Sequence, residues 1–181
     1  MRIGITGSTG LAATIAGALQ DHDITHVRVE EAQLVWEELA ADIFINCAHV
    51  GFEQTKLLMR AYEAWKNDSS KYIINISSRA AQPNISKGYM YSAQKASLNH
   101  LVSNLTYNSK KYCRICTINL GLLNHIDLPS VSHQEVAETI KYIIDLPQHL
   151  EIPEITLQNS ANYQEVQSDK EALKDLEEWL N

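Results

Sequence analysis

A short apolar run, followed at once by a glycine-rich turn and an alanine-rich segment, opens the sequence. The run is Arg2–Thr6 (RIGIT), the turn contains Gly7 and Gly10, and residues 10–20 repeat apolar side chains at helical spacing. A mostly apolar run of this length is typical of a parallel strand that is covered on both faces. A strand that leads through a tight turn into a helix predicts the first half of a βαβ unit.

The same alternation continues to residue 157. Further strands are expected at 25–29, 43–48, 71–76, 114–119 and 152–157, and helices at 32–41, 52–65, 91–109 and 132–145. Ser132 and Glu135 have the spacing of a capping box, which marks a helix N-terminus. This order predicts an α/β fold, a doubly wound parallel sheet of about six strands with helices on both faces. The 181 residues are expected to form a single domain, with 158–181 as a tail that ends in a helix.

Net charge and cysteine content indicate which partners, location and cysteine chemistry to expect. A formal net charge of -7 argues against nucleic acid and against an anionic membrane as a partner. Three cysteines and no apolar leader favour a cytoplasmic location. Cys113 and Cys116 lie three residues apart in an expected strand, so their side chains should point to opposite faces and form neither a redox pair nor a metal site.

Short polar motifs follow four of the expected strands, and ligands of parallel sheets bind beyond the carboxyl ends of the strands. The motifs are TGSTGLAA at 6–13, NCAH at 46–49, NISS at 75–78 and NLG at 119–121. In the first motif, the glycines allow a tight turn and bring the backbone close to a pyrophosphate at the helix N-terminus. A glycine turn alone is equally consistent with a simple turn.

Tyr91 and Lys95 are one helical turn apart, and Ser78 lies thirteen residues before the tyrosine. Residues i and i+4 share a helix face, so the ammonium would favour the phenolate and make the tyrosine a proton donor and acceptor near neutral pH. A serine hydroxyl from a neighbouring strand end could hold a carbonyl oxygen against that phenol. Together the three residues predict carbonyl reduction or alcohol oxidation.

Two other pairs, Tyr62 with Lys66 and Tyr107 with Lys111, have the same spacing. Neither has a serine thirteen residues upstream. A tyrosine and a lysine at this spacing are by themselves more typical of a solvated helix face, so the context of Tyr91 carries the prediction.

The motifs, taken in this order, resemble the short-chain dehydrogenase/reductase family over residues 1–157. TGSTGLAA is similar to the family's TGxxGxxG nucleotide loop, and NCAH to its Asn-Ala-Gly motif. NISS is similar to its serine strand, YSAQK to its active-site helix and NLG to its Pro-Gly turn. The resemblance implies a Rossmann-like fold, NAD or NADP as cofactor, and a tyrosine that passes a proton while hydride moves at the nicotinamide.

The resemblance also implies roles for individual residues. Ser78 would orient the carbonyl, Tyr91 would be the general acid/base, and Lys95 would lower the pKa of the tyrosine and hold the nicotinamide ribose. The residues implied for cofactor binding are Gly7, Ser8, Thr9, Gly10, Leu11, Glu30, Asn46, Cys47, Ala48, Ile76, Tyr91, Lys95, Gly121 and Leu123. No metal is expected.

The choice between NAD and NADP depends on charges near the end of the second strand. Glu30 and Glu31 lie about twenty residues past the glycine loop, where an acid binds the ribose 2'-hydroxyl and repels a 2'-phosphate. Arg28 is also close and could instead pair with a phosphate. Solvated loop charges are an equally ordinary interpretation, so we expect NAD or NADP with a slight preference for NAD.

The sequence also departs from the family pattern. The family usually has a further strand and helix between the second and third strands found here. Its catalytic asparagine has no counterpart in 51–66, Leu120 replaces the proline of its Pro-Gly turn, and 124–131 is short where a substrate lid is common. We therefore expect a pared-down site, wide and shallow, in which Lys95 reaches bulk water directly.

The leading hypothesis is an NAD(P)-dependent oxidoreductase that interconverts a small-molecule carbonyl and its alcohol. One alternative is a non-catalytic dinucleotide-binding redox sensor or assembly subunit on the same fold. Another is a nucleotide-sugar epimerase or reductase-like enzyme. The resemblance further implies a homodimer or homotetramer in which helices 52–65 and 91–109 pair across a two-fold axis. The apolar residues expected there are Leu57, Leu58, Ala61, Ala96, Leu98 and Leu101.

Overall fold

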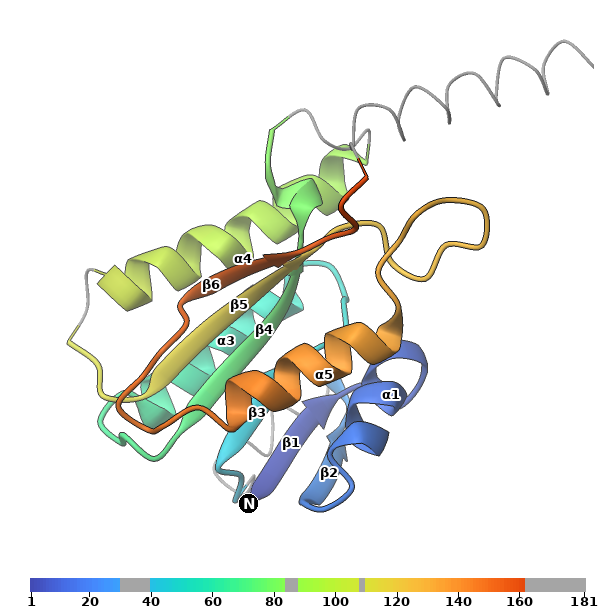
Figure 1. Cartoon of the computed structure of the whole chain (residues 1–181). Coiled ribbons are helices and arrows are strands. Elements are labelled where there is room, and N and C mark those ends of the chain that lie inside the picture. Colours follow the sequence, from blue (N-terminus) through green and yellow to red (C-terminus); the bar gives the residue numbers. More distant parts are fainter. Residues whose placement is uncertain (30–39, 84–87, 108–109, 162–181) are drawn as a thin grey trace, which may run out of the picture.

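The computed structural model describes residues 1–29, 40–83, 88–107 and 110–161, and its strands form one parallel sheet (Figure 1). The strands are β1 (Arg2–Thr6), β2 (Asp23–Val27), β3 (Ile43–Asn46), β4 (Tyr72–Ser78), β5 (Arg114–Leu120) and β6 (Glu154–Leu157). Their order across the sheet is β2-β1-β3-β4-β5-β6, and every neighbouring pair is parallel. The predicted six-stranded parallel sheet is thereby confirmed.

Helices cover both faces of this sheet, as predicted. They are α1 (Gly10–Ala18), α3 (Glu53–Trp65), α4 (Tyr89–Tyr107) and α5 (His133–Ile144), with a short 3-10 helix η1 (Arg79–Ala81) after β4. Helices α1 and α5 lie on one face and α3 and α4 on the other (Figure 1). In the described part of the chain, no helix has both the length and the hydropathy needed to cross a membrane.

Most predicted helices and strands agree with the structure, and the differences lie in where they begin and end. Strand β4 continues to Ser78, two residues past its predicted end, and β2 lies two residues earlier than predicted. No sequence pattern predicted η1. The predicted helix at 32–41 falls mostly outside the described residues, and the predicted helix of the C-terminal tail falls wholly outside them.

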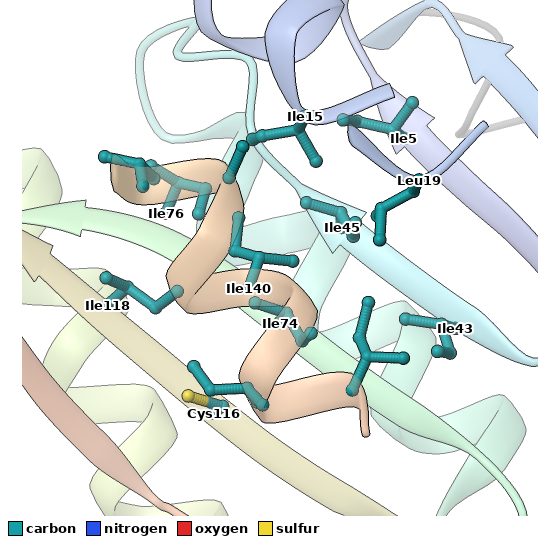
Figure 2. Close-up of a cluster of buried hydrophobic side chains, with 14 of the residues drawn as sticks. Ile5, Ile15, Leu19, Ile43, Ile45, Ile74, Ile76, Cys116, Ile118 and Ile140 are labelled. Atoms are coloured by element: carbon teal, nitrogen blue, oxygen red, sulfur yellow. The ribbon is translucent and has the colours of Figure 1, made fainter. Parts of the chain in front are cut away.

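The face under α1 and α5 is filled by branched aliphatic side chains (Figure 2). Ile15 of α1 and Ile140 of α5 meet Ile45, Ile74 and other strand residues there, and all of them are essentially inaccessible to solvent. β-branched residues suit this layer because they pack well on a pleated surface. Cys116 belongs to this layer and Cys113 to the opposite one, so the two cysteines lie on opposite faces as predicted.

The face under α3 and α4 changes from apolar to polar along the strands. Phe44 and Ile73 lie near the amino ends of their strands and are fully buried. Two residues further along, the register places Asn46 beside Asn75, and Asn75 beside Thr117. These three polar residues, which we call the polar row, are at most 1% exposed. The polar row therefore makes this face of the sheet polar near the carboxyl ends of its central strands.

The predicted dimer surface is wrong in four of its six residues, while Ala96 and Leu101 are half-buried. Leu57, Leu58, Ala61 and Leu98 are fully buried against the sheet within one copy of the chain. They were assigned to an interface because an apolar stripe on a helix does not show which of its neighbours it covers. Self-association stays a prediction, and a surface on α3 would instead have to use exposed residues such as Met59.

The capping box of α5 should contribute measurably to the free energy of unfolding. Ser132 Oγ accepts the Glu135 backbone N–H, and the Glu135 carboxylate accepts the Ser132 backbone N–H at 2.7 Å. Ser132→Ala leaves one helix N–H without its side-chain partner and should lower the free energy of unfolding by about 1 kcal/mol, measured by urea denaturation. Ser69→Ala, in an exposed turn, is the control and should stay within about 0.5 kcal/mol of the wild type.

Candidate active site

The three residues predicted to act together all lie at the carboxyl edge of the sheet. Ser78 is the last residue of β4 and the N-cap of η1, and η1 packs against the start of α4. Tyr91 and Lys95 lie in the first two turns of α4, which is well formed over 19 residues. Figure 1 shows that α4 begins near the end of β4 and runs back alongside β5 and β6. The site is thus assembled from two elements that are adjacent in space.

Lys95 is buried, and its ammonium is held by two oxygens. The residue is 3% exposed, and Nζ donates to Gln54 Oε1 at 2.7 Å and to the Ile76 carbonyl at 2.9 Å. The same Nζ lies 5.7 Å from the centroid of the Tyr91 ring. Burial lowers the pKa of Lys95 to about 8, since removal from water disfavours the charged form.

The prediction that Lys95 reaches bulk water through an open cleft is therefore wrong. It rested on the absence of an asparagine in 51–66, but Gln54 in the first turn of α3 supplies an amide instead. Gln54 is itself 2% exposed and closes the space between α3 and the lysine. The signal was present in the sequence, because glutamine and asparagine carry the same hydrogen-bonding group.

Tyr91 is half open to solvent, in contrast to the lysine one turn away. Its exposed fraction is 38%, so the phenol can meet a ligand. The ring of His49 approaches it edge-on, with 4.9 Å between ring centroids and an interplanar angle of 83°. Burial and the nearby Lys95 ammonium lower the pKa of His49, which favours a neutral ring beside the tyrosine. No sequence motif pointed to His49 as a neighbour of Tyr91.

The two pairs with the same spacing lack this arrangement. Tyr62 is 6% exposed in the apolar core, while Lys66 forms an ion pair with Glu63 on the surface. Tyr107 ends α4 at the opposite end of the helix and is 71% exposed. The lysine four residues beyond it lies outside the helix and bonds Glu151. The Lys111 side chain is also mostly buried, so what sets the Tyr91 pair apart from the other two is an accessible phenol with a buried lysine one turn away on the same helix.

The Ser78 hydroxyl already makes hydrogen bonds with two backbone groups. Its Oγ accepts the Ala80 N–H at 3.1 Å, which caps η1, and lies 3.4 Å from the Leu120 carbonyl. Lys95 contacts the carbonyl of Ile76, two residues before Ser78 on the same strand, so the serine and lysine share one strand end. The hydroxyl is anchored at the rim of the site rather than buried within it.

The glycine loop has the features that a pyrophosphate requires. Gly7 and Gly10 have φ values of +88° and +54°, which other residues adopt only with strain. A side chain built at Gly10 would meet only His133, at 3.9 Å, so space lies open above the loop. The N-cap Thr9 makes no side-chain cap, and the first turn of α1 has no acid, so its N–H groups can receive an anion. Ser8, Thr9 and Gly10 are exposed there, and Leu11 is half-buried.

The loop after β3 is tied to the glycine loop rather than free. Thr6 Oγ1 accepts the N–H groups of Cys47 and Ala48 at 2.8 and 2.9 Å. Ala48 also lies 3.4 Å from the position of a side chain built at Gly7, so the two loops pack closely. Asn46 faces inward: its amide donates to the Gln54 carbonyl and to Asn75 Oδ1. Its fully buried side chain is not available to a ligand, which corrects its predicted role in lining the site.

Four predicted cofactor residues remain, and the structure accounts for three of them by packing or backbone contacts. Ile76 contributes its backbone carbonyl to Lys95, while its side chain is buried in the aliphatic layer. Close packing explains why a glycine stands at 121, because a Cβ atom there would lie 2.9 Å from Gln158 Cβ. Leu123 pairs with Val131 in an isolated bridge and packs on the aliphatic layer. Glu30 lies outside the described residues.

Metal ligation is a separate question from the dinucleotide site. Among the residues that the structure describes, no group of three or more His, Cys, Asp or Glu side chains is placed to hold a metal ion. Burial raises the pKa of the Cys47 thiol to about 11, which keeps it protonated near neutral pH. Protonated in this way, the Cys47 thiol is a poor metal ligand and a poor nucleophile.

The buried ammonium should make stability depend on pH. An unfolded lysine has a pKa of 10.5 and Lys95 one of about 8, so the unfolded chain binds more protons between these values and stability rises with pH. The wild type should therefore gain roughly 2–3 kcal/mol relative to Lys95→Met between pH 7 and pH 10, measured by urea denaturation. Lys141→Met, an exposed change on α5, is the control and should show a constant difference. A constant difference for Lys95→Met as well would mean that its ammonium is hydrated.

Comparison with known proteins gives the fold a clear set of relatives. No protein-family model matches the sequence, and no curated protein matches it. Among solved structures, serine dehydrogenase complexed with NADP+ superposes with a TM-score of 0.73 at 17% identity, covering 90% of this chain and 96% of that one.

Two further structures are similar with somewhat lower TM-scores. The 3-alpha-hydroxysteroid dehydrogenase from Pseudomonas sp. B-0831, complexed with NADH, has a TM-score of 0.67 at 16% identity and covers 87% and 94% of the two chains. A short-chain dehydrogenase/reductase from Vibrio parahaemolyticus has a TM-score of 0.67 at 16% identity and covers 86% and 98%. The chain has the short-chain dehydrogenase/reductase fold, in agreement with the resemblance seen in its motifs.

Proposed function

We propose that this protein is an oxidoreductase that interconverts a small carbonyl compound and its alcohol with a nicotinamide dinucleotide. The observation that carries the proposal is the pairing of an accessible Tyr91 phenol with the buried ammonium of Lys95, 5.7 Å from its ring. A protein that only binds a dinucleotide has no need to bury a lysine at this cost beside an exposed tyrosine. The two similar pairs in the chain lack this arrangement.

Each residue has a defined part in such a reaction. The Ser78 hydroxyl, fixed at the end of β4, would orient the carbonyl oxygen toward the phenol. Tyr91 would give its proton to that oxygen in reduction and take it back in oxidation. The Lys95 ammonium would stabilise the phenolate that remains, because a positive charge favours the ionised form of a neighbouring acid. The neutral ring of His49 would limit the orientation of the Tyr91 ring.

The dinucleotide would lie along the carboxyl edge, and when bound it would supply or accept the hydride. The glycine loop and the N-terminus of α1 would hold its pyrophosphate, and Lys95 would face its nicotinamide end. Two of the similar structures named above, serine dehydrogenase and the 3-alpha-hydroxysteroid dehydrogenase, are complexes with NADP+ and with NADH respectively. For this chain we keep a slight preference for NAD, which a titration with NADH and NADPH tests directly.

Tyr91→Phe should remove turnover and leave dinucleotide binding nearly intact. The ring still packs against His49, but the proton donor is lost, and such groups contribute ~10²–10⁴-fold to rate. The measurement is NADH oxidation against a panel of small aldehydes and ketones, together with NADH binding by fluorescence.

Tyr107→Phe and Tyr62→Phe are the matched controls, because they alter the two other tyrosines with the same spacing. Both should turn over at rates close to the wild type. If Tyr91→Phe retains more than about a tenth of the wild-type rate, the phenol is not the proton donor.

A charge placed in the glycine loop should weaken dinucleotide binding. Ser8 is exposed between Gly7 and Gly10 at the N-terminus of α1, where an anion is favoured by free N–H groups. Ser8→Glu would compete with the pyrophosphate and should raise the NADH dissociation constant by about tenfold or more in calorimetry. Ser69→Glu adds the same charge in an exposed turn elsewhere and should leave it unchanged. Equal affinity of both variants would place the dinucleotide away from this loop.

A further inference from the structure

Gln54 has only one possible orientation in its pocket. Its amide nitrogen donates to the carbonyls of Asn46 at 2.9 Å and Ile76 at 3.0 Å, and lies 3.5 Å from that of Cys47. Its oxygen faces Lys95 Nζ at 2.7 Å. A reversed amide would place its oxygen against carbonyls and its N–H groups against an ammonium, and both contacts are repulsive. The loop after β3 and the end of β4 therefore aim the Gln54 oxygen at the lysine.

We propose that Gln54 is a positioning residue for the active site, which holds the Lys95 ammonium one helical turn from Tyr91. The inference rests on the proposed oxidoreductase function. The family resemblance implies an asparagine that supports the lysine, and residues 51–66 contain no asparagine. The inference gives this supporting role to the amide of Gln54 in the first turn of α3. The helix that carries it is fixed relative to α4 by a second contact, between Thr55 Oγ1 and Ser97 Oγ at 2.9 Å.

The oxygen of Gln54 also favours the charged form of the lysine. A buried ammonium without acceptors is expensive, and here a side-chain oxygen and a backbone carbonyl receive two of its three protons. The titratable groups that face Lys95 are Tyr91 on its own helix and Cys47 and His49 after β3. Burial raises the pKa of the Cys47 thiol to about 11, and the His49 ring has no anionic form near neutral pH, so neither offers Lys95 a negative charge. The acceptor of Gln54 is the contact that substitution can change.

Two substitutions at Gln54 should move the same property in opposite directions. Gln54→Met keeps the length and removes the acceptor, so the Lys95 pKa should fall below its value of about 8. Gln54→Glu keeps the size and adds a carboxylate, so that pKa should rise. The Lys95 pKa would be measured on the full chain by NMR with 13C-labelled lysine, with its signal assigned by Lys95→Met.

The alkaline limb of the pH–kcat profile should follow the same two shifts, downward for Gln54→Met and upward for Gln54→Glu. Circular dichroism checks that each variant is folded, and the isosteric Gln54→Glu tests the inference if Gln54→Met does not fold. Gln134→Met, an exposed change on α5, is the control and should move neither property. A merely structural role for Gln54 would lower stability without opposite shifts, and that result would overturn the inference.

The two proposals fail in different ways. If the Lys95 pKa responds to both variants but no carbonyl in the panel is turned over, Gln54 positions the lysine and the oxidoreductase proposal fails. If turnover is found but neither variant changes the Lys95 pKa or the pH profile, the oxidoreductase proposal stands and the role of Gln54 is rejected.

Discussion

The buried ammonium of Lys95 is the interaction on which the rest of the site depends. A charge that is 3% exposed requires polar partners on every side, and the fold supplies them from the backbone of β4 and from the first turn of α3. The polar row continues this environment across the sheet, where the amide of Asn46 donates to Asn75. These groups would destabilise an ordinary apolar core. They are tolerated because the opposite face of the sheet is mostly aliphatic and supplies hydrophobic stabilisation (Figure 2).

The order of strands and helices could be predicted from the sequence because apolar runs and helical periodicity repeat without interruption. The parallel sheet, the capping box of α5 and the opposite faces of Cys113 and Cys116 follow from spacing alone. Ser78 was placed correctly at a strand end, although β4 runs two residues further than its apolar run indicated. That extension occurs because β4 pairs with β5 as far as Leu120, a contact that no local pattern reveals.

Three features of the site could not be predicted because they depend on contacts between distant segments. The burial of Lys95 needs Gln54, which lies 41 residues earlier. The inward amide of Asn46 needs Asn75 on the next strand, and a motif match alone placed it on the ligand side. The apolar stripes of α3 and α4 also have two possible partners, and packing on the sheet rather than on a second copy becomes evident only from the arrangement in Figure 1.

The segment between β2 and β3 is short relative to the family, and the contacts that hold Lys95 come from other parts of the chain. Strand β2 lies at the edge of the sheet, and the segment that is short relative to the family follows it. Lys95 lies on α4 and is held by contacts from α3 and β4, and the loop after β3 orients Gln54. Strands β3 and β4 are the two central strands of the sheet, away from the β2 edge. In the proposed complex, loss at the β2 edge would remove part of the surface beside the adenosine end of the dinucleotide and leave the lysine contacts intact. A chain reduced in this way should therefore lose cofactor affinity before it loses the geometry of Tyr91 and Lys95.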